Sequence, residues 1–265
     1  MSGLVLSVFP GIGLLDMAFE EEGFTVVRGP DLLWGGDVKR FHPPAGIFEG
    51  IIGGPPCQAF SRLRHMVEAN GYQVAENLIP EYERVVAEAR PRWFLMENVP
   101  DAPLPSVPSY TTRAELVRDT WVGGLTERLR RFSFGTKDGI RLPIETLALV
   151  GAGEGTVVAG HGLAPGQRDR LHAVVGDARR VPVKLGPGGK PKSTADTGVL
   201  SLNEACRLQG LPEDFADTLP FTTHGKRKVI GNGVPLYMGR AVAKAVNAVK
   251  AAIGESSHSE RKEGG

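Results

Sequence analysis

The chain has 265 residues, of which 41% are hydrophobic and 23% charged, and its formal net charge is +1. These values fit one large domain, or one domain with a small second one, and exclude a strongly basic or acidic protein. Two cysteines are too few for a disulfide framework, and no apolar run approaches the roughly 18 residues of a membrane helix. No basic stretch precedes the first apolar run, so we expect a soluble protein of a reducing compartment.

Short apolar runs and amphipathic segments alternate along the first half of the chain. Apolar runs predict strands, and apolar residues at helical spacing predict helices. The strands are expected at residues 4–9, 24–27, 46–52 and 93–96, and the helices at residues 13–22 and 77–89. This alternation is typical of an open, largely parallel sheet with helices on both faces, so the expected fold class is α/β with a doubly wound, Rossmann-like sheet.

The second half of the chain is less regular. Prolines are frequent after Pro100, and between residues 135 and 197 glycine and proline are common while periodicity is weak. Helices are expected again at residues 201–209 and 236–252. The polar residues 254–265 are expected to be disordered.

Charge is distributed unevenly along the chain. Residues 112–192 contain 14 Lys/Arg and 8 Asp/Glu, whereas the remaining residues contain 17 and 22. A basic segment on an acidic body is consistent with a lobe that binds a polyanion. A solvated loop region with spare arginines would give the same counts.

Glycines follow the first expected strand, in the run SVFPGIG at residues 7–13. Glycine at such a turn lets a ligand approach the backbone beside a helix N-terminus, although the third glycine of a dinucleotide fingerprint is absent. Asp31, just past the second strand, could accept hydrogen bonds from two ribose hydroxyls, and Asp37 could bind an adenine amino group. Each aspartate could instead be a surface turn residue.

Cys57 lies in the run GGPPCQAFS at residues 53–61, directly after an expected strand, and Glu97 ends another. Active sites of α/β proteins form at the carboxyl edge of the sheet, where a cysteine and a glutamate can share one pocket. A lone cysteine is more often a small buried hydrophobe, and a glutamate can simply cap a turn. The prolines and glycines around Cys57 favour the reactive interpretation.

Five motifs, in this order, resemble the cytosine-5 DNA methyltransferase family. They are Phe-x-Gly-x-Gly at residues 9–13, Pro-Cys at 56–57, Glu-Asn-Val at 97–99, and the segments 207–215 and 231–235. The resemblance implies a methyltransferase sheet in a catalytic, cofactor-binding domain at residues 1–135, completed by residues 228–253. It also implies a small, irregular target-recognition domain at residues 136–227.

The resemblance implies covalent catalysis by Cys57. Its thiolate would add to C6 of a cytosine extruded from the duplex, and C5 of the ring would then accept a methyl group from S-adenosylmethionine. Glu97 would bind or protonate N3 of the ring, and Arg130 would hold O2. No metal is required by this chemistry.

The family's Gln-x-Arg-x-Arg motif has two candidates here, and both depart from it. Arg128 and Arg130 follow a threonine in place of glutamine, and Arg168 and Arg170 follow a glycine. We prefer Arg128 and Arg130 as the catalytic pair, because this choice leaves residues 136–200 for target recognition.

Two sets of binding residues are also implied by the resemblance. The S-adenosylmethionine site would comprise Phe9, Gly11, Ile12, Gly13, Leu14, Asp31, Leu32, Asp37, Val38, Pro55, Asn232 and Val234. The DNA contacts would include Pro56, Gln58, Ser61, Asn98, Arg141, Lys184, Lys190 and Lys192. Gly233 departs from the family, which usually has serine at this position.

The expected partner is double-stranded DNA, with a cognate restriction endonuclease as a further partner. The protein is expected to be a monomer in the cytoplasm of a prokaryotic or phage-infected cell, and its compact length favours a phage or mobile-element origin. Three alternatives stay open: methylation of tRNA cytosine by the same chemistry, a degenerate homologue that binds without turnover, and transfer of a different one-carbon group.

Overall fold

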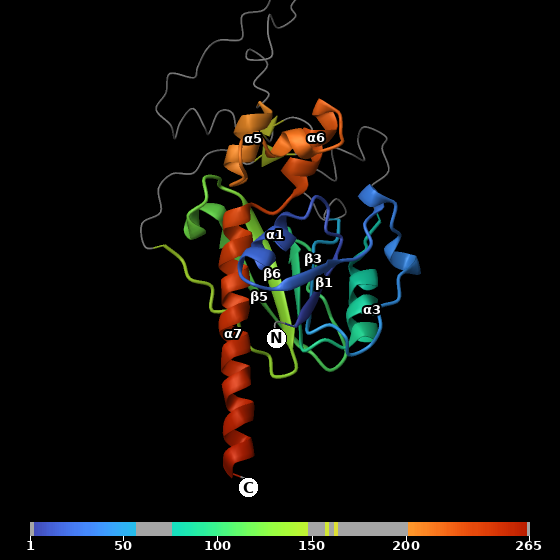
Figure 1. Cartoon of the computed structure of the whole chain (residues 1–265), viewed down its shortest axis with the longest axis vertical. Coiled ribbons are helices and arrows are strands. Elements are labelled where there is room, and N and C mark those ends of the chain that lie inside the picture. The colour runs from blue at the N-terminus through green and yellow to red at the C-terminus, as the bar shows by residue number, and fades with distance from the viewer. Residues whose placement is uncertain (1–2, 57–75, 148–156, 159–161, 164–200, 264–265) are drawn as a thin grey trace, which may run out of the picture. The chain divides into compact units, whose positions relative to one another are not determined.

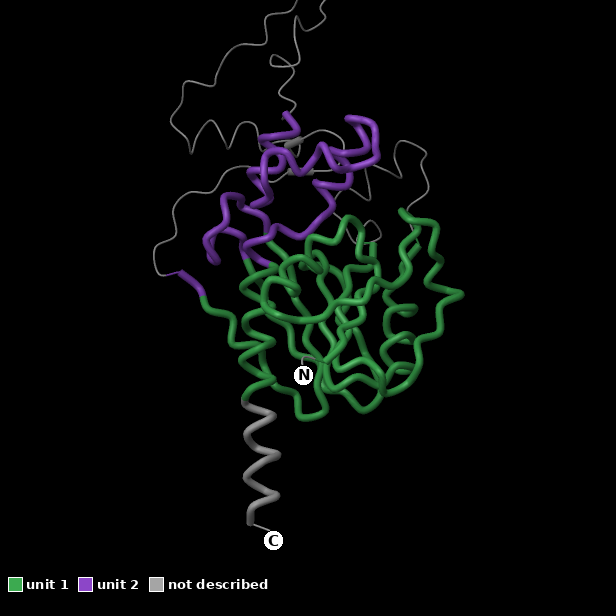
Figure 2. The backbone as a smooth tube through the Cα atoms, viewed as in Figure 1, with its two compact units in different colours: residues 1–117, 129–145, 239–265 green, residues 118–128, 146–238 purple. Residues whose placement is uncertain are grey.

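The chain forms two compact units (Figure 2). The computed structural model describes residues 3–56, 76–147, 157–158, 162–163 and 201–263. The first unit comprises residues 1–117, 129–145 and 239–265, and the second unit comprises residues 118–128 and 146–238.

The division between the units differs from the predicted domain boundaries at three points. Residues 118–128 belong to the second unit, residues 136–145 to the first, and residues 228–238 to the second. The predicted boundaries follow the positions of the family motifs, whereas compact units are defined by contacts between segments that can lie far apart in the chain.

A six-stranded sheet lies at the centre of the first unit (Figure 1). Its strands, in spatial order, are β2 (Thr25–Arg28), β1 (Leu4–Val8), β3 (Gly50–Gly53), β4 (Trp93–Asn98), β6 (Leu129–Thr136) and β5 (Thr111–Arg118). The first four strands are parallel, and β6 is antiparallel to β4. The predicted doubly wound α/β sheet is therefore confirmed, whereas β5 and β6 are absent from the sequence prediction and make the sheet mixed.

Helix α3 (Ile79–Ala89) covers one face of this sheet. Its apolar residues recur at helical spacing and pack against alternate residues of the strands. The buried cluster includes Leu6, Val8, Ile51, Tyr82, Val85, Val86, Ala89, Phe94 and Met96. The hydroxyl of Tyr82 donates to the carbonyl of Leu95 at 2.8 Å, and burial raises the pKa of Tyr82 well above its usual value.

The opposite face of the sheet is covered by helices α1 (Leu14–Glu21) and α7 (Leu236–Glu263) (Figure 1). Phe19 of α1 packs against Trp93 of β4, with ring centroids 6.2 Å apart. A β-carbon added at Gly239 of α7 would come within 2.7 Å of the β-carbon of Ala18, so this glycine lets the two helices approach closely.

The prediction that residues 254–265 are disordered is wrong as far as Glu263, because α7 continues to that residue. A polar composition argues against burial in a core. It does not argue against a helix, whose backbone hydrogen bonds are made within the segment itself.

The second unit consists of short elements. They are η4 (Asp119–Val122), β7 (Val157–Val158), β8 (Gly162–Leu163), α5 (Leu202–Leu208), η6 (Phe215–Thr218) and α6 (Thr223–Asn232). Helix α5 begins after Ser201, whose hydroxyl accepts from the N–H of Glu204 at 3.1 Å, and α6 begins after Thr222, which caps Gly225 in the same way at 3.2 Å. Cys206 of α5 is fully buried, and burial raises the pKa of its thiol.

Candidate active site

The turn after β1 presents open backbone at the carboxyl edge of the sheet. Phe9, Gly11 and Gly13 all have left-handed backbone conformations, with φ of 59°, 57° and 81°. A β-carbon placed on Gly11 would meet no atom within 4 Å, so the backbone is approachable there. Gly13 immediately precedes α1, whose first N–H groups are unsatisfied within the helix. This arrangement fits the predicted role of the turn in binding a ligand.

Asp31 connects this turn to the end of β2. One carboxylate oxygen accepts from the N–H of Gly11 and the other from the N–H of Leu33, each at 2.7 Å. Each oxygen has a second lone pair, so Asp31 can still accept a hydroxyl of a bound sugar. The indole of Trp34 donates to the carbonyl of Gly11 at 2.7 Å, and its side chain is 53% exposed.

Asp37 and Val38 lie on the next turn, at the short helix η2 (Val38–Arg40). The carboxylate of Asp37 accepts from the N–H of Lys39 at 3.0 Å, and Val38 is buried against α3. The predicted cofactor residues from Phe9 to Val38 therefore all lie in the first unit, on the turns that follow β1 and β2.

Glu97 lies near the carboxyl end of β4 and forms an ion pair with Arg130 of β6. The Arg130 Nε to Glu97 Oε1 distance is 2.8 Å, and the side chains are 15% and 12% exposed. The other carboxylate oxygen of Glu97 lies beside Gly54, where an added β-carbon would be 3.2 Å away from it. The glycine after β3 thus leaves room for the carboxylate that sequence reasoning placed in the same pocket as Cys57.

Asn98 fixes the chain just before Cys57. Its side chain is buried, and its amide nitrogen donates to the carbonyl of Pro55 at 3.1 Å, while its amide oxygen accepts from the N–H of Val99 at 2.9 Å. Pro55 and Pro56 are described, but the predicted residues Cys57, Gln58 and Ser61 lie outside the described residues.

Known relatives of this chain are DNA-modifying enzymes. A family model described as C-5 cytosine-specific DNA methylase matches residues 36–104. The type II methyltransferase M.MthTI of Methanothermobacter thermautotrophicus is 25% identical over 91% of this chain and 96% of its own length. M.NgoPII of Neisseria gonorrhoeae, also a type II methyltransferase, is 32% identical over 36% of this chain, and the match spans only 33% of M.NgoPII. This chain is therefore similar, over part of its length, to C-5 cytosine-specific DNA methylases, and along most of its length to a type II methyltransferase.

Solved structures share the fold of this chain. A prophage-encoded protein of E. coli has a TM-score of 0.56 at 18% identity, covering 93% of this chain and 99% of its own. DNMT2 of Spodoptera frugiperda has a TM-score of 0.55 at 13% identity, covering 92% of this chain and 99% of its own.

Of the predicted site residues in the second unit, Arg128 and Val234 are buried, whereas Asn232 is exposed. Arg128 is 4% exposed, and its Nη1 donates to the carbonyl of Gly231 at 2.8 Å. Asn232 ends α6 next to that glycine, and Val234 is buried two residues later. These contacts describe how the three residues are held and leave their predicted roles in catalysis and cofactor binding as predictions.

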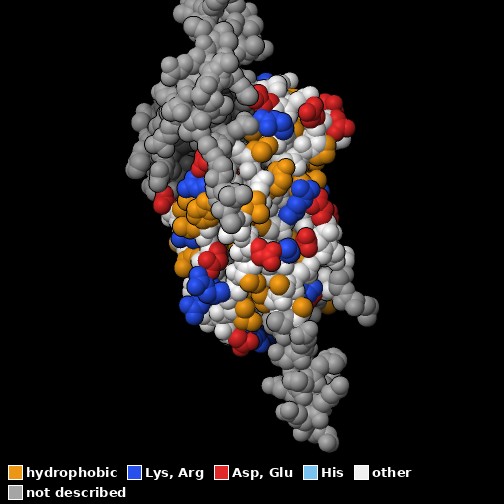
Figure 3. Space-filling view, turned by 90° about the vertical axis from the view of Figure 1, so that its left-hand side faces the viewer, with side chains coloured by type: hydrophobic (Ala, Val, Ile, Leu, Met, Phe, Trp, Pro, Cys, Tyr) orange, Lys and Arg blue, Asp and Glu red, His pale blue; other side chains and the backbone are white. Residues whose placement is uncertain are grey.

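The DNA contacts predicted for the basic segment are described only at Arg141. Its side chain is 72% exposed and pairs with Glu115 at 2.7 Å. Lys184, Lys190 and Lys192 lie outside the described residues, as do Arg168 and Arg170 of the alternative motif. On the face drawn in Figure 3, basic and acidic side chains are interspersed and form no patch of one sign.

Two features were not found among the described residues. No cluster of His, Cys, Asp and Glu among them could hold a metal ion. No helix among them is long and apolar enough to cross a membrane.

Sequence reasoning missed two residues at this edge of the sheet, Trp34 and Arg28. The indole of Trp34 donates to the glycine turn. Arg28, at the end of β2, pairs with the buried Asp16 at 3.0 Å, and its guanidinium lies against Gly13. The position of Arg28 at a strand end was a usable signal, since ligand sites of such sheets gather there.

Proposed function

We propose that this chain transfers a methyl group from S-adenosylmethionine to C5 of a cytosine in double-stranded DNA, with Cys57 as the covalent nucleophile. The observation that carries the proposal is the Glu97–Arg130 ion pair beside Gly54, three residues before Cys57. The match of residues 36–104 to the C-5 cytosine-specific DNA methylase model supports both the base and the position modified.

The nucleophilic step uses the thiolate of Cys57. The sulfur adds to C6 of the ring, and the C5–C6 electron pair becomes available at C5 while charge develops at N3 and O2. After C5 has been methylated, loss of its proton and expulsion of the thiolate restore the C5–C6 double bond. A free cysteine is mostly protonated at neutral pH, so the site must favour the anion.

Glu97 and Arg130 stabilise the charge on the ring. Glu97 takes up a proton as the base displaces it from Arg130, and in that protonated form it donates to N3 while Arg130 donates to O2, so that groups already in position stabilise the charge formed by thiolate addition. Their ion pair without substrate keeps both side chains at the strand ends, and an incoming base exchanges with it.

The cofactor site comprises the turns after β1 and β2. Gly11 offers open backbone, Asp31 retains acceptor capacity for ribose hydroxyls, and Leu32 and Trp34 expose apolar surface for a nucleoside. These residues fit S-adenosylmethionine, which when bound supplies an electrophilic methyl group. Asn232 and Val234 would complete the site by resemblance to the family.

The target cytosine must leave the duplex before it can reach Cys57, which costs a few kcal/mol of unstacking and unpairing. The basic middle segment, including Arg141 and Lys184, would grip phosphates during this step. The type II names of the relatives support a modification role in the prokaryotic cytoplasm alongside a restriction endonuclease.

Expression in cells that lack cytosine methylation, followed by bisulfite sequencing of plasmid DNA, tests the proposal. Wild type should protect cytosines in one sequence context, and Cys57→Ala should lose activity by on the order of 10⁴-fold or more. Cys206→Ala is the matched control, because Cys206 is buried in α5 and plays no part in the reaction.

Two in vitro assays identify the nucleic-acid substrate and detect the covalent adduct. Duplex DNA should accept methyl groups and tRNA should not. DNA carrying 5-fluorocytosine should form a denaturation-resistant adduct with wild type only, since fluorine cannot leave C5 as a proton. Methylation by Cys57→Ala would overturn the mechanism.

A further inference from the structure

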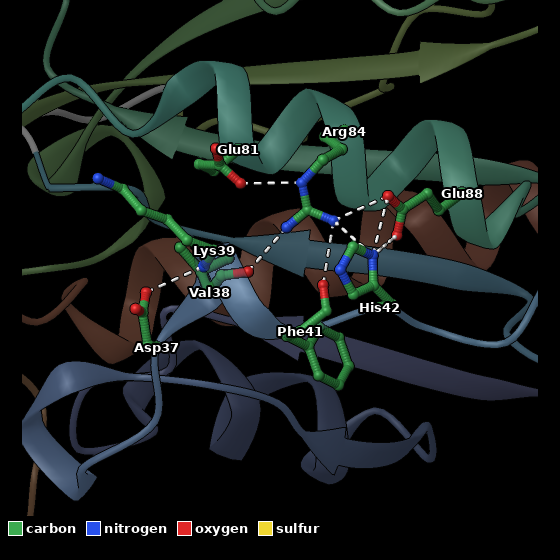
Figure 4. Close-up of polar contacts among 8 residues, drawn as sticks. All are labelled: Asp37, Val38, Lys39, Phe41, His42, Glu81, Arg84 and Glu88. Atoms are coloured by element: carbon green, nitrogen blue, oxygen red, sulfur yellow. Dashed lines mark hydrogen bonds and ion pairs between the residues drawn. The ribbon is translucent and has the colours of Figure 1, made fainter.

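Arg84 of α3 holds the turn that carries Asp37 and Val38 (Figure 4). Its Nη2 donates to the carbonyl of Val38 at 2.7 Å, and its Nη1 donates to the carbonyl of Phe41 at 3.0 Å. The Val38 carbonyl also accepts the N–H of Phe41 at 3.1 Å, which closes the short helix η2, and the Phe41 carbonyl follows that helix. The guanidinium therefore ties the start of η2 to the residue that follows its end.

Two glutamates on the same helix orient this guanidinium. Arg84 Nε donates to Glu81 and Arg84 Nη1 donates to Glu88, each at 2.9 Å, and the arginine side chain is 27% exposed. Burial acts to lower the pKa of Arg84, but the hydrogen bonds to Glu88 and Glu81 outweigh it and raise the pKa. Nδ1 of His42 lies 3.1 Å from Oε2 of Glu88, so the cluster of polar contacts around Arg84 extends beyond the turn to His42.

The turn therefore has one fixed side and one accessible side. Val38 is buried and Phe41 is packed against the cluster under α3, which together with Arg84 fixes the backbone. The carboxylate of Asp37 lies on the accessible side and accepts from the N–H of Lys39. A carboxylate held this way loses little further conformational freedom when it binds a ligand.

We propose that Arg84 is a positioning residue for the adenine end of S-adenosylmethionine: it never touches the cofactor, but it holds Asp37 and Val38 where they bind the ring. The proposal rests on the proposed function, and it adds a residue outside the family motifs that sets cofactor affinity. Without Arg84, the Phe41 carbonyl loses its guanidinium donor and the Val38 carbonyl keeps only the Phe41 N–H, so the backbone at Asp37 would sample other conformations.

Calorimetric binding of S-adenosylhomocysteine and of 5′-methylthioadenosine to wild type and Arg84→Met tests this role. Both ligands carry adenine, and only the first carries the amino acid moiety. Arg84→Met should weaken both by the same factor of about ten, because charge-assisted hydrogen bonds hold the turn. In the methylation assay, the KM for S-adenosylmethionine should rise by this factor, while kcat and the KM for DNA change less than about twofold.

Arg240→Met is the matched control. Arg240 also donates two hydrogen bonds to a glutamate: its Nε lies 2.5 Å and its Nη2 3.0 Å from the two carboxylate oxygens of Glu21. It lies on α7, away from the turn at Asp37 and Val38. It should leave both affinities unchanged. If Arg84→Met does not fold, Arg84→Lys serves, because it keeps the charge beside Glu81 and Glu88 but cannot bridge the two carbonyls in the same way.

The outcomes separate this inference from the proposed function. Failure of wild type to bind either ligand would overturn the proposed function. Normal binding by wild type with equal affinity in the folded Arg84 variant would overturn the positioning role alone, as would an equal rise in the KM for DNA.

Discussion

Arg128 and Arg130 are two residues apart, yet they belong to different units and meet different partners. Arg130 pairs with Glu97 at the carboxyl end of β4, where both side chains retain some exposure. Arg128 is almost fully buried and donates to the carbonyl of Gly231, 103 residues further along the chain. The chain crosses from the second unit to the first between them.

This contrast shows that spacing within a motif does not determine the role of each arginine. A guanidinium that binds a buried carbonyl cannot move away without leaving that carbonyl with no hydrogen-bond donor. We therefore expect Arg128 to keep its buried position. A guanidinium paired with a partly exposed carboxylate can exchange partners when a polar ring arrives. The surroundings therefore favour Arg130 as the residue that meets the base, and Arg128 as the residue that holds the second unit together.

Among the substitutions that test this contrast between the two arginines, the largest effect is expected for Arg130→Met. Loss of a donor aimed at charge that develops in the transition state should lower kcat by about 10²- to 10³-fold. The free energy of unfolding should change less than in Arg128→Met, because both Arg130 and Glu97 retain some exposure and water can reach the carboxylate. Single-turnover methylation and urea unfolding measure the two effects.

Arg170→Met provides the comparison for that experiment, because Arg168 and Arg170 form the alternative motif. A full kcat in Arg130→Met together with a large loss in Arg170→Met would transfer the catalytic role to the second pair.

Much of the first unit could be predicted from the sequence because its signals are local. Strands β1, β3 and β4 are apolar runs, and α1 and α3 repeat apolar residues at helical spacing. Glu97 could be placed at a strand end for the same reason. Strand β6 was missed because arginines occupy the half-exposed positions at its start, and its pairing with β4 is a long-range contact.

The partners of the site residues could not be predicted, since they depend on segments far apart in the chain. Nothing near Arg128 indicates that its acceptor is Gly231, and nothing near Asn98 indicates that its amide holds Pro55. The clamp of Arg84 on Val38 likewise joins residues 46 positions apart. Local periodicity carries no information about such contacts.

A somewhat smaller effect, on stability this time, is expected for Arg128→Met. Removal of one partner from a buried polar arrangement typically costs about 3 kcal/mol, because the other groups remain buried without compensation. The midpoint of urea unfolding should fall more than in Arg130→Met, and kcat per folded molecule should fall less. The reverse ranking in both measurements would contradict the division of roles between the two arginines.

The smallest effect concerns Asp119, which lies beside Arg128 in the buried part of the second unit. One of its oxygens accepts from the N–H and the hydroxyl of Thr126, at 2.9 and 2.8 Å. Burial raises the pKa of Asp119, and the hydrogen bonds from Thr126 and the charge of Arg128 only partly offset this. The folded protein therefore holds this proton more tightly than the unfolded chain does.

The sign of the pH effect follows from that difference in proton affinity. The stability associated with protonated Asp119 is fully present below its ordinary pKa of 3.8 and is lost as pH rises through the raised value. Asp119→Asn cannot titrate, so its free energy of unfolding should improve relative to wild type as pH rises from 4 toward neutrality, by less than the loss in Arg128→Met. In an Arg128→Met background, one positive charge fewer opposes the rise in the pKa of Asp119 that burial causes. The gain in unfolding free energy from Asp119→Asn as pH rises should therefore become larger. Urea unfolding of wild type, Asp119→Asn, Arg128→Met and the double variant across this pH range isolates Asp119. The contributions of the other carboxyl groups cancel when each protein is compared with its Asp119→Asn counterpart. A difference that stays constant with pH would mean that Asp119 binds its proton equally well in the folded and the unfolded protein, and that Arg128 stabilises the second unit through Gly231 alone.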